Sequence, residues 1–222
     1  MTSNDYQKII DYLYENQDLK YKDFHCSLKG ANEMIGVRTS ILKNIAKEIS
    51  KHDYLSFIKL NKKYYYEEKA ILAYLIGYLK IDFDSVLRLL EDNLYYFDTW
   101  ALTDGLCANL KIFKKYQEKG FTFINKLLEN NNAWYIRIGL VLLLDHYIND
   151  HYIDKILEIS LNITNDDYYV IMANAWLISI CYIKYPNKTS DILDKLDSVT
   201  RKKAISKIND SKRVKEKLVL IN

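Results

Sequence analysis

Apolar residues recur along the chain at helical spacing, with polar residues between them. In the segment 39–50 they follow at steps of three and four residues, which places them on one side of a helix. These are Ile41, Leu42, Ile45, Ala46 and Ile49. The same pattern predicts further helices around Ile9–Leu13, Tyr21–Leu28, Glu67–Leu79, Asp84–Tyr95, Thr99–Lys114, Phe121–Glu129, Ala133–Ile148, Tyr152–Leu161, Tyr168–Tyr185, Thr189–Leu196 and Val199–Ile208. No segment shows the alternation of a β-strand, so the sequence predicts an all-α protein.

The long apolar helices themselves recur. They begin near Tyr65, Thr99, Ala133 and Tyr168, a period of roughly 34 residues with room for a second helix in each interval. Such recurrence is typical of an α-solenoid, in which each helix pair buries its apolar side against its neighbours. The tetratricopeptide pattern is not reproduced, so irregular HEAT-like pairs, forming an armadillo-like superhelix with a concave face, fit better. Since no linker rich in Gly, Pro or Ser divides the chain, we expect one domain over residues 1–222.

Composition narrows the classes of function. The chain has 1 Pro and 6 Gly in 222 residues, which is low for a fold that depends on turns. A net charge of +3 does not by itself indicate a polyanionic partner. The three cysteines, Cys26, Cys107 and Cys181, are widely separated and lie in apolar runs, where a free cysteine behaves as a small hydrophobe and is expected to be buried. They fit unpaired thiols in a reducing cytosol. With no signal pattern at the N-terminus and no apolar stretch long enough for a bilayer, we expect a soluble, cytoplasmic protein without a membrane partner.

Several standard chemistries find no support. The glycines are isolated, so no phosphate-binding loop is formed, and no Gly-x-Ser-x-Gly elbow occurs. The four histidines lack a paired metal-ligand spacing, and His146 and His151 bracket a predicted turn, where surface positions are expected. We therefore expect neither a metal nor a cofactor.

Candidate functional residues lie on the recurring helices. Trp100 and Asp104 are four residues apart, which places an indole and a carboxylate on one side of a helix. Arg137 follows one recurrence later in an apolar helix, where its guanidinium needs an anionic or hydrogen-bonding partner. Trp176 follows another recurrence on. Taken singly, the tryptophans could fill the core and Asp104 could pair with Arg137; taken together, the four could converge on the concave face.

The end of the chain is basic. Between 201 and 217 the basic residues are Arg201, Lys202, Lys203, Lys207, Lys212, Arg213, Lys215 and Lys217, against Asp210 and Glu216. They could be a solvated helix end, with cations near the helix C-terminus, or they could contact phosphates. On the second interpretation Arg201, Lys202, Lys203 and Arg213 are the candidate contacts.

At these residues the chain resembles the HEAT-like-repeat DNA alkylation repair glycosylases. The similar segments are Asp98–Asp104, Trp134–Arg137, Ala173–Trp176 with Tyr185-Pro186, Met34–Ser40 and the basic C-terminal helix. Their order and spacing cover nearly the whole chain. The resemblance implies excision of cationic N3- or N7-alkylated purines from duplex DNA without a cofactor. Because solenoids of this type are usually self-sufficient, we expect a monomer, cytoplasmic and nucleoid-associated when bound to DNA.

The resemblance also implies roles for single residues. Trp100 and Trp176 would flank the deoxyribose, Asp104 would lie near its anomeric carbon, and Arg137 would hold phosphate or carboxylate. An alkylated purine already carries a positive charge, so its glycosidic bond breaks without a general acid. One carboxylate and two indole faces therefore suffice to stabilise the cationic sugar and to place a water.

Segment 18–36 departs from the family. Ser27 stands where the family often has an aromatic residue on its second, DNA-contacting helix, and Ser40 stands where it usually has proline. One branch of the family lacks that helix, and this segment is similar to that branch. Two other functions therefore stay open: a scaffold of the same fold that binds DNA weakly or another partner, and a protein–protein adaptor in which Asp104 and Arg137 only pair with each other.

Overall fold

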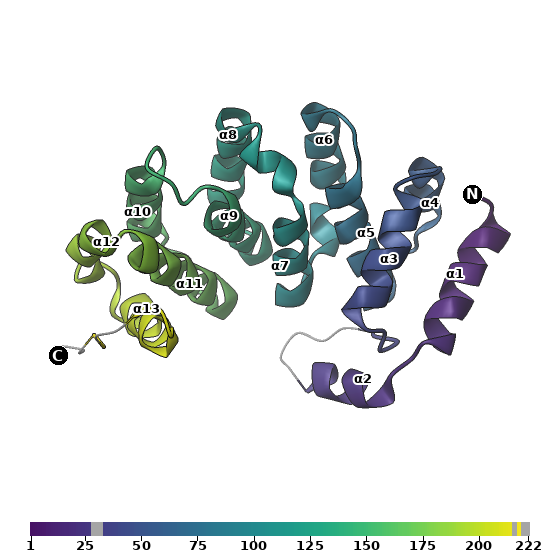
Figure 1. The fold of residues 1–222 in the computed structure, drawn as a ribbon, viewed down its shortest axis with the longest axis horizontal. Coiled ribbons are helices and arrows are strands. Elements are labelled where there is room, and N and C mark those ends of the chain that lie inside the picture. Colours follow the sequence, from purple (N-terminus) through teal and green to yellow (C-terminus); the bar gives the residue numbers. More distant parts are fainter. Residues whose placement is uncertain (28–32, 215–216, 219–222) are drawn as a thin grey trace. The chain divides into compact units, whose positions relative to one another are not determined.

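The computed structural model describes residues 1–27, 33–214 and 217–218 (Figure 1). In these residues the regular structure is helical, apart from one isolated bridge between Gln17 and Val37. This confirms the all-α prediction. The chain divides into two compact units, 1–112 and 113–222, which are described separately below. The single domain over 1–222 stays a prediction.

Unit 1 contains α1 (Ser3–Glu15), α2 (Leu19–Cys26), α3 (Thr39–Ile49), α4 (Tyr54–Leu60), α5 (Tyr66–Tyr78), α6 (Phe83–Asn93), the 3₁₀ turn η1 (Leu94–Tyr96) and α7 (Trp100–Asn109). Helices α3, α5 and α7 pack side by side in one row, while α6 packs on α5 and α1 on α4. Helix α5 is the centre of this unit: every residue from Tyr66 to Ile76 is buried. A helix that is buried all round needs apolar residues on all sides, which the run Ala70–Ile76 supplies.

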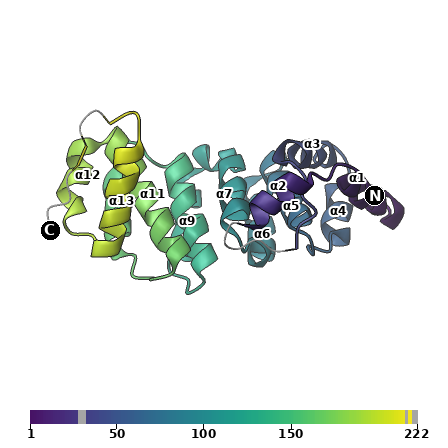
Figure 2. The same ribbon diagram turned by 90° about the horizontal axis from the view of Figure 1, so that it is seen from below.

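Unit 2 contains α8 (Gln117–Leu128), α9 (Ala133–His146), α10 (Ile153–Asn162), α11 (Tyr168–Lys184), α12 (Pro186–Leu193) and α13 (Ser198–Asp210); the 3₁₀ turn η2 (Lys111–Lys114) lies at the junction of the two units. Helices α9, α11 and α13 form one row, seen in Figure 2. Helix α8 packs on α9, and α10 and α12 pack on α11 and on each other. Each unit thus has one row of neighbouring helices with others packed against it.

The expected recurrence is present in the helix starts. Helices α5, α7, α9 and α11 begin at Tyr66, Trp100, Ala133 and Tyr168, at the period of roughly 34 residues that the sequence predicts. A second helix lies between each successive pair: α6, α8 and α10. The continuous HEAT-like stack stays a prediction.

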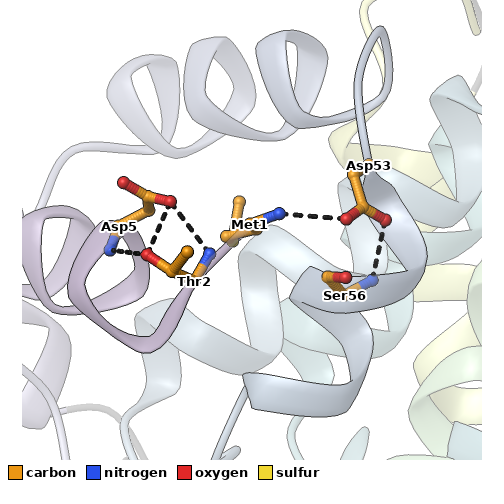
Figure 3. A network of polar contacts seen from close by, with 5 residues as sticks. All are labelled: Met1, Thr2, Asp5, Asp53 and Ser56. Carbon is orange, nitrogen blue, oxygen red and sulfur yellow. Dashed lines mark hydrogen bonds and ion pairs between the residues drawn. The ribbon is translucent and has the colours of Figure 1, made fainter.

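The start of α1 is fixed by its own residues and by α4 (Figure 3). Thr2 and Asp5 form a capping box, with the Asp5 amide donating to Thr2 Oγ1 at 3.2 Å and the Thr2 amide donating to Asp5 Oδ2 at 2.8 Å. Asp53 caps α4 through the Ser56 amide and accepts from the Met1 ammonium at 2.9 Å. Hydrogen bonds from Ser56 and from this ammonium lower the pKa of Asp53 to about 2.

The structure differs from the predicted helices in two places. Helix α4 is not predicted by the periodicity, because its seven residues bury only Phe57. The single helix expected over Thr99–Lys114 is divided, since α7 ends at Asn109 and Lys111–Lys114 form a 3₁₀ turn. The shorter helix expected around Tyr21–Leu28 is present as α2, and positions 28–32 of that segment lie outside the described residues.

Within the described part of the chain, no helix is both long and apolar enough to cross a membrane.

Candidate functional site

Helix α7 presents Trp100 and Asp104 from unit 1. The helix begins at Trp100 because Thr99 Oγ1 accepts from the Leu102 amide at 3.3 Å. Trp100 and Asp104 are one turn apart and partly exposed, whereas Leu102 is buried on another side of the helix. The Thr103 hydroxyl lies 3.2 Å from Asp104 Oδ1 and 3.0 Å from the Trp100 carbonyl oxygen, and it can donate to one of them at a time. The indole and the carboxylate therefore share one accessible side of α7.

Helix α2 contributes a residue that the sequence did not single out. The His25 ring lies parallel to the Trp100 indole, at 11° with 6.4 Å between ring centroids, and 5.0 Å from the Tyr66 ring. In Figure 2, α2 lies across the start of α5 beside α7. No sequence motif marks His25; only the packing of α2 on α5 and α7 brings it to Trp100.

The loop after α2 is held by a buried carboxylate. Glu67 is fully buried and accepts from the amides of Ile35, Gly36 and Val37 at 2.9, 2.7 and 3.1 Å. Gly36 has a φ of +106°, which favours glycine, and a Cβ there would lie 2.7 Å from Lys22 Cβ. The polypeptide that returns from α2 is thus fixed to α5 through Glu67.

Arg137 lies in α9 of unit 2, with only 5% of its surface exposed. One guanidinium nitrogen, Nη1, donates to the Tyr169 carbonyl oxygen of α11 at 2.8 Å, so the buried guanidinium has the hydrogen-bonding partner that it needs. The Tyr169 ring in turn packs against Trp134, with 4.7 Å between centroids. Arg137 is therefore a buried charge fixed between two helices of the row.

Trp176 lies on α11, seven residues or two turns after Tyr169, and so on the same side of that helix. Its indole is partly exposed, while its neighbours Ala175 and Leu177 are buried. In unit 2 the structure thus places Arg137 and Trp176 on adjacent helices of one row. The convergence of these two with Trp100 and Asp104 stays a prediction.

The basic C-terminal residues begin on α13, which packs on α11. Lys202 and Lys203 are exposed, as is Arg213 beyond the helix end. Arg201 differs, because it is partly buried and its Nη2 forms an ion pair with Asp194 Oδ1 at 2.6 Å. Of the four candidate phosphate contacts, three are therefore directed to solvent and one is already paired within the protein. Lys215 lies outside the described residues.

Two sequence expectations are wrong. His146 is buried, not on the surface, because the last turn of α9 stacks it on Phe113 at 6.4 Å. Cys26 is exposed near the end of α2, whereas Cys107 and Cys181 are buried as expected. Burial raises the pKa of the Cys181 thiol to about 12, so this thiol stays protonated.

In residues 1–27, 33–214 and 217–218, no three His, Cys, Asp or Glu side chains gather as a metal site would require.

Comparison with known proteins identifies the family. No curated protein and no solved structure matches the chain. The family model described as DNA alkylation repair enzyme matches residues 10–208, a range that includes α2, the pair Trp100 and Asp104, Arg137, Trp176 and most of α13. The chain therefore belongs to the DNA alkylation repair enzyme family.

Proposed function

We propose that the protein is a DNA glycosylase that hydrolyses the N-glycosidic bond of N3- or N7-alkylated purines in duplex DNA. The observation that carries the proposal is the pair Trp100 and Asp104 on one accessible turn of α7, in a chain that belongs to the DNA alkylation repair enzymes. The two units would continue one HEAT-like stack as a monomeric single domain in the cytoplasm. Its concave face would then bring α7, α9 and α11 to one lesion.

The chemistry needs little from the protein because the leaving group is already cationic. As the glycosidic bond breaks, positive charge moves to the sugar, and a fixed carboxylate at Asp104 stabilises that charge. The same carboxylate orients a water molecule and accepts its proton. Indole faces from Trp100 and Trp176 attract the cationic sugar. A second carboxylate, as sugar hydrolases use to protonate the leaving group, is not required.

Arg137 has a different role in this proposal from the one that the sequence suggests. With 5% of its surface exposed and Nη1 bonded to the Tyr169 carbonyl oxygen, it offers little area to a phosphate. We infer that it acts as a fixed positive charge that holds α9 to the first turn of α11, the helix that carries Trp176. In this proposal the direct contacts with phosphates are made by Lys202, Lys203 and Arg213.

The test is base release from a duplex that contains a single N7-methylguanine. We expect release well above the spontaneous rate. In Asp104→Asn the rate of release should fall by about 100-fold or more, which is typical when one group that stabilises transition-state charge is removed. Asp92→Asn is the matched control, since Asp92 is exposed on α6. Release at the spontaneous rate by folded wild-type protein contradicts the proposal.

The second candidate function is a scaffold of the same family that binds DNA without excision. It is favoured by one observation: α2 has eight residues and buries none of them, so the element expected to contact DNA is short and lightly packed. Duplex binding with a steep salt dependence, together with no base release, would favour this scaffold. Absence of both binding and release would favour the adaptor.

A further inference from the structure

His25 lies at the meeting point of three helices in unit 1. It is on α2 and has ring contacts with Tyr21 of the same helix, at 5.7 Å, with Tyr66 of α5, at 5.0 Å, and with Trp100 of α7, at 6.4 Å. The contact with Trp100 differs from the other two, since its rings are nearly parallel at 11°. A flat ring on this side of the indole restricts the tilt of the indole plane.

The contact matters because little else of α2 is packed. None of its residues is buried, yet His25 is partly buried and its Nδ1 is shielded from solvent. Its ring therefore contributes to the seating of α2 on α5 and α7, and through that contact it limits where the Trp100 indole can go.

The charge on His25 is set by its surroundings. Burial lowers the pKa of His25, and the Glu67 carboxylate opposes this more weakly. Glu67 is already hydrogen-bonded to three backbone amides, and Tyr66 stays protonated because burial raises its pKa. Tyr21 faces the ring from α2, and α7 presents the uncharged indole, with the Asp104 carboxylate one turn further along the same side of α7. At neutral pH the imidazole is consequently uncharged.

We propose that His25 is a positioning residue for Trp100: its imidazole, held by ring contacts between α2, α5 and α7 and nearly parallel to the indole, fixes the indole plane. This rests on the proposed function, in which the indole attracts a cationic lesion. An imidazolium beside the indole would repel a cationic substrate that approaches the indole face. Protonation of His25 should therefore weaken the site on the acid side of neutrality.

Two variants test the proposal: His25→Phe, which keeps a flat uncharged ring, and His25→Ala, which removes the ring. The first readout is tryptophan emission of the free protein, because a nearby imidazolium quenches indole. The pH is lowered from about 7.5 through and below the ordinary histidine range, since burial lowers the pKa of His25. Trp100→Phe identifies the share of the emission that comes from Trp100. We expect an acid quench in the wild type that is absent in both Trp100→Phe and His25→Phe.

The second readout is excision kinetics on the N7-methylguanine duplex. His25→Ala should lower kcat by about tenfold through a misplaced indole, with KM nearly unchanged and Trp100 emission shifted to longer wavelength. His25→Phe should keep the neutral-pH rate and lose the acid-side decline. Unchanged emission and rate in His25→Ala, or an acid quench that persists in His25→Phe, would overturn the proposal. If the wild type excises nothing, the proposed function fails, while the emission measurements still decide the role of His25.

Discussion

Arg38 holds the Asp18 carboxylate with two nitrogens, Nε at 2.9 Å and Nη2 at 2.7 Å from the same oxygen, Oδ2. The pair closes the polypeptide on either side of α2, and the Arg38 guanidinium also covers the Tyr21 ring at 4.7 Å from its centroid. Asp18 at the same time caps α2 by accepting from the Tyr21 amide at 2.9 Å. The Asp18 carboxylate thus caps the first turn of α2 and ties it to Arg38.

This relationship predicts a pH dependence of stability. Hydrogen bonds from the Tyr21 amide and then from Arg38 lower the pKa of Asp18. A carboxyl whose pKa is lower in the folded state stabilises it above the unfolded pKa, and loses that contribution as pH falls through the folded value. Asp18→Asn keeps a capping side chain but removes the charge. Its Tm should therefore lie below that of the wild type at pH 7, with a difference that shrinks below about pH 4.

Thermal melts of the two proteins at stepped pH measure this difference. Asp92→Asn, at an exposed position on α6, is the control and should show no such convergence. A Tm difference that stays constant down to pH 2.5 would show that the charge of Asp18 does not contribute.

A second prediction concerns the buried carboxylate of Glu67. Its Oε1 accepts from the Gly36 and Val37 amides, and its Oε2 accepts from the Ile35 amide. In Glu67→Gln one oxygen is replaced by an NH₂ group, which faces an amide donor and cannot accept from it. We expect a loss of about 3 kcal/mol in the free energy of unfolding.

Urea unfolding of Glu67→Gln measures this loss, and hydrogen exchange should show faster exchange of the amides of residues 35–37. Glu91→Gln, an exposed substitution on α6, is the control and should change stability by less than about 0.5 kcal/mol. A variant as stable as the wild type would contradict the role assigned to Glu67.

The helical fold was predictable because hydrophobic periodicity is a local signal. The division of the helix expected over Thr99–Lys114 is an exception. The hydrophobic periodicity shows no break between α7 and η2, because Leu110 and Phe113 are both buried and continue the periodicity. At the end of α7, Asn109 lies against Gly77 of α5, where an added Cβ would lie 2.7 Å from the Asn109 Cβ. Such a close approach between helices is not encoded in the spacing of one of them.

The candidate site also has a part that the sequence predicts and a part that it does not. The spacing of Trp100 and Asp104 fixes their common side of α7 once the helix is recognised. The contact of His25 with Trp100 depends on how α2 packs on α5 and α7, and no pattern within 18–36 reports that packing. Likewise, the charge of Arg201 is visible in the sequence, whereas its ion pair with Asp194 follows from the turn between α12 and α13.

A third prediction concerns Phe24. Its side chain is 63% exposed on α2, one turn before Ser27, the position at which the family resemblance places an aromatic contact. An exposed phenylalanine on the helix expected to touch DNA can pack on sugars or bases, so Phe24→Ala should weaken duplex binding by about fivefold or more.

Because Phe24 buries little in the free protein, the same variant should melt within about 2 °C of the wild type. The control is Tyr95→Ala, which removes an aromatic ring that is 76% exposed on η1. Fluorescence anisotropy with a labelled duplex compares the two. Equal binding by Phe24→Ala and the wild type would remove α2 from the DNA contact.

The last prediction separates the paired and the solvent-directed cations of α13. Each phosphate contact releases counterions, so the logarithm of the affinity falls with the logarithm of salt concentration by about 0.9 per contact. Exposed Lys202 and Lys203 should contribute fully, and the double variant with both changed to Gln should lower the slope by about 2. Arg201→Gln should change it less, because Arg201 is already paired with Asp194.

Anisotropy titrations from about 50 to 300 mM salt give the slopes. The control exchanges two other exposed lysines of unit 2 for Gln, Lys126 of α8 and Lys155 of α10, and so removes the same net charge from helices outside the α9, α11 and α13 row. If both double variants lower the slope equally, the effect is one of net charge alone, and α13 is not a phosphate-contacting helix. A decrease confined to Lys202 and Lys203 places the DNA backbone along α13, beside the helix that carries Trp176.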